Sequence, residues 1–356
     1  MRIAVIGAGN GGQAIAAYLS LKGAHVSLYD YESAKVNELN ARGNIIELKG
    51  CIEAKSKIDL ISGDMASVVK DAEVILITTI ANAHKPVARQ LAGLLQDGQI
   101  VILSPGRTGG ALEFRRVLDE EGNDARVYVA EAQTLVYACR VIENGVVNII
   151  GIKDKVLLAA LPSSDTAHVL SMINQYYHCF VAAENVLRTS LENIGAIFHP
   201  TVLLFNAATV ERQDEFWFYK DMTPQVADFI ERFDAERIAV GKAYGIELLG
   251  VSEWISYAYP GTVGNTLCEK MKNNPAYRDI KSPSTIFTRQ LTEDIPTGVV
   301  PIMELGRAAG LEMPLMRSIV DICSALLNED FYEGRTLANL GLEGLSVNEI
   351  LNKLSL

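Results

Sequence analysis

The sequence predicts an α/β fold in which a mostly parallel sheet is followed by an all-helical second domain. Short apolar segments alternate with helical segments through the first half of the chain, which is the pattern of a parallel sheet covered by helices on both faces. A glycine-rich turn follows the first of these segments. After about residue 184 helical periodicity replaces the strand-like segments, which indicates a change of domain.

The predicted strands of the first half are short and rich in β-branched residues. They span residues 3–6, 25–29, 73–79, 99–103, 126–129, 146–152, 156–161 and 180–182. The predicted helices between them span residues 13–21, 32–41, 65–69, 86–95, 112–120 and 166–176. Residues 45–61 alternate apolar and charged side chains, which favours a hairpin. Because such sheets bind ligands at the carboxyl ends of their strands, binding is expected at loops 7–12, 79–84, 104–110 and 131–134.

The second half carries the start and stop signals of helices. Thr223 and Pro224 supply a cap and a first-turn proline, and Gly245 ends the helix that follows. Residues 346–349 form a capping box before a final helix. We therefore predict a dinucleotide-type domain over residues 1–186 and a helical substrate domain over residues 187–356.

Composition restricts the class of protein. A chain of 356 residues is long enough for two domains. Its net charge of −11 argues against nucleic acid as a partner. No apolar run approaches the roughly 20 residues that a membrane helix needs, and the apolar start is a strand interrupted by glycine rather than a signal peptide. The five cysteines are scattered, so we expect reduced thiols, a cytoplasmic protein and no metal site.

The glycine-rich turn fits the dinucleotide fingerprint. Gly7, Gly9 and Gly12 have its spacing, directly after a strand and at the start of a helix. The next strand ends at Asp30, where the fingerprint requires an acid for the ribose hydroxyls. Such an acid repels a 2′-phosphate and favours NAD, whereas Lys35, one turn into the next helix, leaves NADP open. The predicted cofactor-binding residues of this turn and strand end are Gly7, Ala8, Gly9, Asn10, Gly11, Gly12 and Asp30.

Two segments of the helical half carry unusual polar residues. His199 precedes Pro200 in a helix predicted to run from Glu192 and to be apolar nearly all round, so it is either a buried core histidine or a functional one. Thr292 or Asp294 caps the helix that runs from Pro296 toward Gly310, and capping does not exclude that the carboxylate of Asp294 also orients a histidine. Arg289 either forms a surface ion pair or binds a carboxylate substrate.

The order of these motifs resembles the octopine/nopaline (opine) dehydrogenase family. The matching segments are Gly7–Gly12, Ser104–Gly110 followed by Ala-Leu-Glu-Phe, Glu131–Arg140, Asn193–Pro200 and Arg289–Gly298. The resemblance implies a Rossmann domain followed by a helical domain, with the reaction in the cleft between them. It also implies joining of an amino acid to a 2-keto acid, commonly pyruvate, and reduction of the imine with NAD(P)H.

The resemblance assigns roles by motif. His199 is then the general acid/base, Asp294 its partner and Arg289 the clamp for a substrate carboxylate. Further substrate contacts are expected from Asn193, Gln133 and Thr134, and further cofactor contacts from Ile80, Pro105 and Gly106. No motif fixes the amino donor, and the apolar helices of the second domain are compatible with a homodimer.

Two other functions stay open at this point. One is a 2-keto or 3-hydroxy acid dehydrogenase, or a ketopantoate-type enzyme, which has no need of an amine. The other is a protein that binds NAD(H) as a sensor and has no catalytic activity. A requirement for both an amino acid and a keto acid would distinguish an opine dehydrogenase from either.

Overall fold

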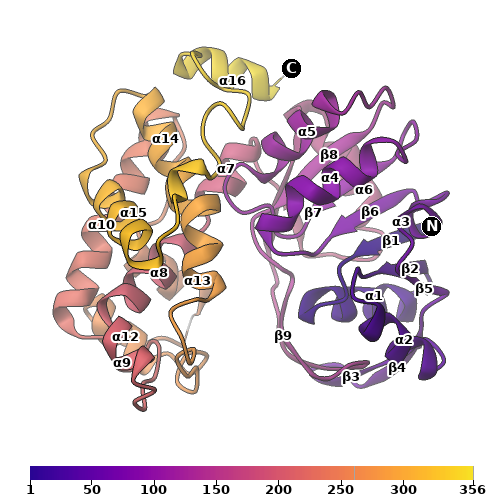
Figure 1. Ribbon diagram of the computed structural model, residues 1–356, viewed down its shortest axis with the longest axis horizontal. Helices are drawn as coiled ribbons and strands as arrows, with labels where there is room; N and C mark the ends of the chain where they lie inside the picture. The colour runs from indigo at the N-terminus through magenta and orange to yellow at the C-terminus, as the bar shows by residue number, and fades with distance from the viewer. Residues whose placement is uncertain (260, 356) are drawn as a thin grey trace. The chain divides into compact units, whose positions relative to one another are not determined.

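A computed structural model describes residues 1–259 and 261–355 and divides the chain into two compact units (Figure 1). The first contains residues 1–190 together with the C-terminal residues from Asn352 on, and the second contains residues 191–351. The division lies within α7 (Val186–Leu191), the helix at whose start the sequence places its domain boundary.

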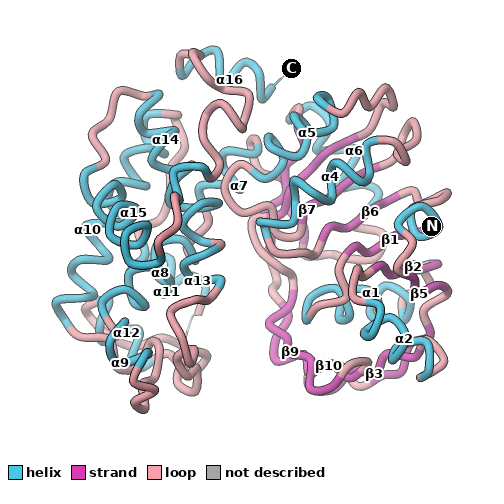
Figure 2. Tube along the Cα trace, in the orientation of Figure 1, coloured by secondary structure: helices cyan, strands magenta, loops and turns pink. Residues whose placement is uncertain are grey.

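The first unit is built on an eight-stranded sheet with the order β12-β11-β8-β7-β6-β1-β2-β5. The strands, drawn in magenta in Figure 2, are β1 (Arg2–Ile6), β2 (His25–Tyr29), β5 (Leu60–Ser62), β6 (Val74–Ile77), β7 (Ile100–Leu103), β8 (Tyr128–Ala132), β11 (Val156–Leu161) and β12 (Phe180–Ala182). Neighbouring strands are parallel except for the antiparallel pair β8 and β11. Every residue of β6 and β7 is buried, as expected of central strands covered on both faces. The predicted α/β class is confirmed.

Helices connect these strands. They are α1 (Asn10–Leu21), α2 (Ser33–Ala41), α3 (Met65–Val69), α4 (His84–Ala92), α5 (Gly110–Glu120) and α6 (Thr166–Ile173). The first of them begins three residues earlier than predicted, because Asn10, Gly11 and Gly12 already belong to its first turn. It packs against β1 and β2 on one side and against a second, smaller sheet on the other. Helix α1 therefore lies between the two sheets.

The smaller sheet has the order β4-β3-β10-β9. Its strands are β3 (Ile45–Gly50), β4 (Ala54–Lys57), β9 (Tyr137–Glu143) and β10 (Val146–Ile152). The predicted hairpin is confirmed for β3 and β4, which pair antiparallel, while the end of the same segment leaves to form β5. Strand β9 was not predicted. Its first residues lie in the segment Glu131–Arg140 that matches the family, beyond the predicted loop 131–134, and the strand pairs with β10.

The second unit is helical, as predicted. Its helices are α8 (Gly195–Phe205), α9 (Ala207–Glu211), α10 (Pro224–Ala243), α11 (Val251–Ala258), α12 (Leu267–Asn273), α13 (Arg289–Thr292), α14 (Val300–Ala308) and α15 (Pro314–Leu327), and the chain ends in α16 (Val347–Ser355). Thr223 caps α10 by accepting from the backbone N–H of Val226, and the predicted capping box at Ser346 and Glu349 is formed. A π-helix, Ile295–Val299, leads directly into α14.

Across residues 1–259 and 261–355 no helix has both the length and the apolar character needed to cross a membrane. The five cysteines carry no disulfide.

Candidate functional site

The glycine turn lies at the carboxyl end of β1 and leaves room for a ligand. Gly7 has a φ of +103°, which favours glycine. A Cβ on Gly12 would lie 1.7 Å from the carbonyl oxygen of Gly7, so this glycine lets α1 approach the strand closely. A Cβ on Gly9 would meet nothing within 4 Å. The three glycines therefore match the fingerprint: Gly7 permits the tight turn, Gly9 leaves space for the pyrophosphate, and Gly12 permits close packing of helix on strand.

Asp30 follows β2 and is directly linked to this turn. The residue is 4% exposed, and its Oδ2 accepts a hydrogen bond of 2.8 Å from the backbone N–H of Ala8. The acid predicted for the ribose thus also connects the ends of β1 and β2.

The next strand ends of the sheet contribute a buried hydroxyl and a tight loop. Thr79, after β6, has a buried Oγ1 for which the described residues supply no hydrogen-bond partner, and Ile80 beside it is half exposed. After β7 the chain passes through a cis peptide bond between Ser104 and Pro105. Gly106 then packs so closely on Glu131 that a Cβ would lie 2.5 Å from its Cβ.

These features fit a bound dinucleotide. The open space at Gly9, the glycine at position 12 and the buried hydroxyl of Thr79 all lie at the carboxyl edge of parallel strands, where such sheets bind nucleotides. The first turn of α1 directs backbone N–H groups and the positive end of the helix dipole to the same edge. The side chain of Asn10 is engaged elsewhere, because its Oδ1 accepts a 2.7 Å hydrogen bond from the N–H of Val141.

The segment after β8 holds the predicted substrate residues Gln133 and Thr134. The Oε1 of Gln133 accepts a hydrogen bond of 2.9 Å from the N–H of Leu157, so its carbonyl oxygen is tied to β11. Leu135 packs on the glycine turn, since a Cβ on Gly11 would lie 2.9 Å from both of its methyl groups. Lys153 donates a 2.7 Å hydrogen bond to the carbonyl of Leu135. Residues 133–135 are therefore fixed to β11, to Lys153 and to the glycine turn.

Glu131, for which the sequence predicts no specific role, lies at the centre of a buried network. It is 0% exposed. Its Oε1 accepts from the hydroxyls of Thr189 (2.6 Å) and Ser190 (2.8 Å), and its Oε2 accepts from the N–H of Ala111 in the first turn of α5 (2.8 Å). A glutamate inside an otherwise apolar strand was the sequence signal for it, since a buried carboxylate needs such partners.

In the helical unit His199 and Asp294 lie in contact. The Nδ1 of His199, in α8, is 2.6 Å from Oδ2 of Asp294. The aspartate is 0% exposed, whereas the histidine side chain is 20% exposed. Residues 95 positions apart therefore form a buried carboxylate–imidazole pair. With Nδ1 facing the carboxylate, Nε2 is the ring nitrogen that remains for proton exchange.

The cap predicted as an alternative role for Asp294 is not formed by its side chain. Thr288 caps α13 by accepting from the N–H of Gln290, and the Asp294 side chain makes no capping bond to the π-helix that follows it in the described chain. The reason is geometric: the π-helix starts at Ile295, and Oδ2 of Asp294 faces the histidine instead.

Arg289 is held in place by a neighbouring acid. Its guanidinium lies 3.4 Å from Oε2 of Glu293, which is buried, while the arginine side chain is 55% exposed. The predicted ion pair therefore exists. It leaves much of the planar fork facing solvent, and such a fork matches a carboxylate.

The helix predicted to include Glu192 and His199 is interrupted. Helix α7 ends at Leu191 and α8 begins at Gly195, so Asn193 lies in the short connection between them and is buried. A Cβ on Gly298, in the π-helix, would lie 2.5 Å from the Cβ of Ala196 and 3.0 Å from Nδ2 of Asn193. The prediction of one continuous helix was wrong because the polar pair Glu192–Asn193 marks a turn.

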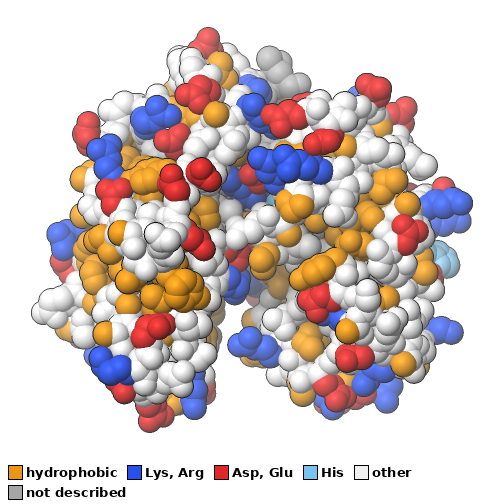
Figure 3. Space-filling model, viewed as in Figure 1, with side chains coloured by type: hydrophobic (Ala, Val, Ile, Leu, Met, Phe, Trp, Pro, Cys, Tyr) orange, Lys and Arg blue, Asp and Glu red, His pale blue; other side chains and the backbone are white. Residues whose placement is uncertain are grey.

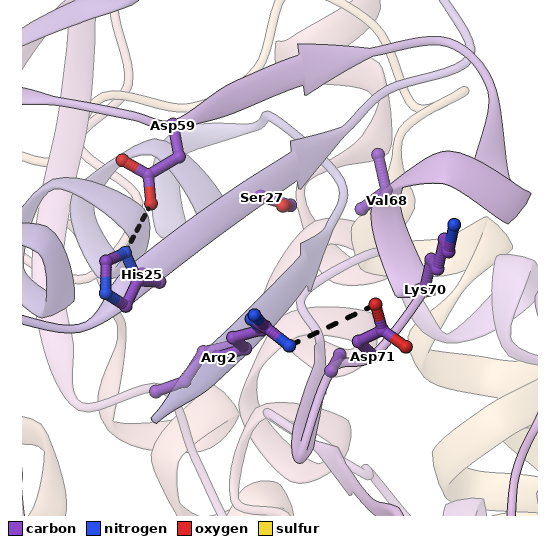
Figure 4. A pocket seen from close by; sticks show the side chains of 9 residues that line it. Arg2, His25, Ser27, Asp59, Val68, Lys70 and Asp71 are labelled. Atoms are coloured by element: carbon purple, nitrogen blue, oxygen red, sulfur yellow. Dashed lines mark hydrogen bonds and ion pairs between the residues drawn. The ribbon is translucent and has the colours of Figure 1, made fainter.

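A hollow of about 350 Å³ lies at the opposite edge of the large sheet, at the amino ends of β1 and β2 (Figure 4). Its lining includes His25, which is paired with Asp59 at 3.0 Å, and Arg2 next to Asp71.

On the face of the molecule seen in Figure 3, acidic and basic side chains are interspersed. Among the residues that the structure describes, no group of His, Cys, Asp and Glu could hold a metal ion.

Comparison with known proteins agrees with this architecture. Residues 182–327 match the family model for the α-helical domain of NAD/NADP octopine/nopaline dehydrogenase. Residues 2–133 match the model for the N-terminus of NAD-dependent glycerol-3-phosphate dehydrogenase. An opine dehydrogenase of Arthrobacter sp. (strain 1C) is 41% identical over 345 residues, which cover 96% of either chain. Protein ocs of Agrobacterium tumefaciens (strain Ach5) is 24% identical over 99% of either chain.

Solved structures share the fold. An octopine dehydrogenase structure with NADH and L-arginine superposes with a TM-score of 0.82 at 20% identity, covering 99% of this chain and 98% of that one. A yersinopine dehydrogenase with NADP⁺ bound reaches a TM-score of 0.74 at 16% identity, covering 100% and 98%.

The nucleotide-binding sheet and the helical unit together define an NAD(P)-dependent oxidoreductase. The reaction class is set by the similarity over nearly the whole chain. The protein belongs to the octopine/nopaline (opine) dehydrogenase family, which acts on the CH–NH group of donors.

Proposed function

We propose that this protein condenses a 2-keto acid, with pyruvate as the first candidate, with an amino acid and reduces the product to an N-(carboxyalkyl) amino acid. The observation that carries the proposal is the pair of His199 and Asp294, 2.6 Å apart in the helical unit. Arg289 lies in the segment that leads to Asp294 and offers a fork for a carboxylate.

His199 acts as the general acid and base. Condensation of a ketone with an amine releases water, and the departing hydroxyl needs a proton that Nε2 can supply. In the reverse direction the same nitrogen accepts it. Asp294 accepts a hydrogen bond from the Nδ1–H group of His199, which fixes the tautomer and stabilises the imidazolium. Its complete burial strengthens this interaction by excluding water.

Arg289 orients the substrate. The buried Glu293 holds one side of the guanidinium, and the remaining N–H groups bind a substrate carboxylate in bidentate fashion. Asn193, Gln133 and Thr134 add polar contacts. For Gln133 that contact is made by the amide nitrogen, because its oxygen already accepts from Leu157.

Residues 1–186 hold the cofactor in this proposal, and residues 187–356 supply the substrate chemistry. NAD(P)H, when bound, supplies the hydride. Gly7, Ala8, Gly9, Asn10, Gly11 and Gly12 would hold its pyrophosphate, and Asp30 would accept a hydrogen bond from a ribose hydroxyl. Ile80, Pro105 and Gly106, after the next two strand ends, would contact the rest of the cofactor.

The test is NADH consumption with pyruvate, glyoxylate or oxaloacetate crossed with a panel of amino acids. We expect turnover only when both substrates are present. Activity with a keto acid alone would support a simple hydroxyacid dehydrogenase, and NADH binding without turnover on any pair would support a sensor. Either result would reject the proposal.

The acid–base pair is tested by His199→Gln and Asp294→Asn. Each should reduce kcat by about 10²-fold or more, and NADH affinity, measured by fluorescence titration, should be unchanged. His178→Gln changes an exposed histidine and serves as the control. Near-normal kcat in His199→Gln would remove the imidazole from its proposed role.

We also propose that the protein works in the cytoplasm, since its five cysteines are all unpaired. A homodimer is proposed through the helical unit, where Ile322 and Leu326 lie exposed one turn apart on α15. Light scattering of the purified protein, and of Leu326→Glu, tests the dimer: a monomer in both would reject it.

A further inference from the structure

Three charged side chains gather where β2 leads into α2. The Nζ of Lys35 lies 3.1 Å from Oδ2 of Asp30 and 3.2 Å from Oε1 of Glu32. Lys35 and Asp30 are largely covered, with side chains 24% and 5% exposed, whereas Glu32 is 48% exposed. A cation therefore lies between an inner and an outer carboxylate at the predicted ribose end of the cofactor site.

The inner carboxylate is occupied by the chain itself. Oδ2 of Asp30 accepts from the N–H of Ala8 (2.8 Å) and from Lys35, and Oδ1 accepts from the N–H of Glu32 (3.0 Å). An ionised carboxylate offers about four acceptor positions, so roughly one remains for a ribose hydroxyl. Asp30 is thus mainly a clamp that joins the glycine turn to the end of β2.

Lys35 compensates the negative charge of the Asp30 carboxylate. Burial alone would lower the pKa of Lys35, but its hydrogen bonds and charge interactions with Asp30 and Glu32 outweigh burial and raise it. The amine is therefore protonated near neutral pH. Asp30 and Lys35 together carry no net charge, and the remaining negative charge of the cluster belongs to Glu32, which is the member most open to solvent.

We propose that Glu32, and not Asp30, weakens the binding of NADPH relative to NADH. We further propose that Lys35 can bind the 2′-phosphate of NADPH, but that its ion pair with Glu32 competes with this contact. A 2′-phosphate adds about two negative charges near this strand end. It would be repelled by Glu32 and would have to compete with Glu32 for Lys35. The 2′-hydroxyl of NADH meets neither obstacle, because it needs only the remaining acceptor position on Asp30.

The expected size of the effect follows from Coulomb's law. A unit charge and a doubly charged phosphate about 6 Å apart in water interact strongly enough to change a dissociation constant roughly tenfold. Glu32→Gln should therefore strengthen NADPH binding about tenfold and leave the Kd for NADH within about twofold. Lys35→Met should weaken NADPH binding by a similar factor, with a much smaller effect on NADH.

The experiment is a fluorescence titration of the full-length protein with NADH and with NADPH, which requires no substrate. Asp124→Asn and Lys70→Met make the same charge changes at exposed positions at the amino edge of the sheet. They should not alter the ratio of the two dissociation constants. Because exposed charges are screened, 0.5 M salt should shrink the effect of Glu32→Gln.

Asp30→Asn separates the two acids. Its amide retains one acceptor oxygen but loses the charge that holds Ala8 and Lys35, so we expect NADH binding to weaken. The lost negative charge offsets part of this weakening for NADPH, so the preference for NADPH should rise less than in Glu32→Gln. A larger rise in Asp30→Asn than in Glu32→Gln would overturn the proposal. So would an unchanged NADH/NADPH ratio in Glu32→Gln, or a gain in NADPH affinity in Lys35→Met. None of these results depends on which amino acid or keto acid the enzyme accepts.

Discussion

A single methyl group should weaken cofactor binding at Gly9 or at Gly12, but should reduce stability strongly only at Gly12. A Cβ at position 12 would lie 1.7 Å from the carbonyl oxygen of Gly7 and 2.7 Å from Oγ1 of Thr78. Real Cβ contacts essentially never fall below 3.0 Å, so α1 must move by at least about 1.3 Å. Such overpacking destabilises a protein by about 1–3 kcal/mol, which lowers the Tm by about 2–4 °C per kcal/mol in a domain of this size.

Position 9 differs because a Cβ there meets nothing within 4 Å and the residue has an ordinary φ of −79°. Gly9→Ala should therefore change stability by less than about 1 kcal/mol. Its methyl group would occupy the space through which the backbone approaches a pyrophosphate, so the Kd for NADH should rise at least about tenfold.

Thermal denaturation and NADH fluorescence titration of both variants measure these effects. Gly12→Ala should lose stability and binding together, and Gly9→Ala should lose binding alone. Normal NADH affinity in Gly9→Ala would refute the assignment of the open space to the cofactor. An unchanged Tm in Gly12→Ala would refute the packing argument.

Three further predictions concern buried contacts. Glu131→Leu removes the acceptor of the Ser190 hydroxyl and the Ala111 N–H, whereas the Thr189 hydroxyl keeps the carbonyl of Val186. It should cost about 1–3 kcal/mol in urea denaturation for each group left unsatisfied; Glu131→Gln should lose clearly less, and equal losses would contradict the network. Burial raises the pKa of Cys139 to about 11, so its alkylation, followed by peptide mass spectrometry, should accelerate about tenfold per pH unit from pH 8. A plateau below pH 9 would be inconsistent with this. Gly298→Ala pushes the π-helix from Ala196 and should reduce kcat about 10–100-fold at unchanged NADH affinity; full activity would show that this contact does not position Asp294.

The first unit could be predicted from the sequence because local patterns determine its elements. Buried strands such as Val74–Ile77 and Ile100–Leu103 are continuous apolar runs, and the glycine turn has a spacing tied to one geometry. Strand β9 escaped prediction because an edge strand is defined by its pairing with β10, and that pairing depends on tertiary structure rather than on local composition.

The candidate site was less accessible to sequence reasoning. His199 and Asp294 are 95 residues apart, and no local pattern states that they meet; the family motifs selected them, and their catalytic roles stay predictions. Spacing alone left Asp294 as a possible helix cap, because a π-helix cannot be distinguished from an α-helix in the sequence. The occupation of Asp30 by Ala8 and Lys35 also depends on how two strand ends approach one another.

The π-helix beside Asp294 makes chain length as important as side-chain identity in this region. A π-helical turn accommodates one residue more than an α-helical turn. Deleting one residue between Ile295 and Val299 would let α14 extend backward as a regular helix, and each residue of such a helix turns the chain by about 100°. Asp294 would then rotate away from His199 although every functional side chain is still encoded. Homologous sequences aligned here should therefore tolerate substitutions more readily than gaps.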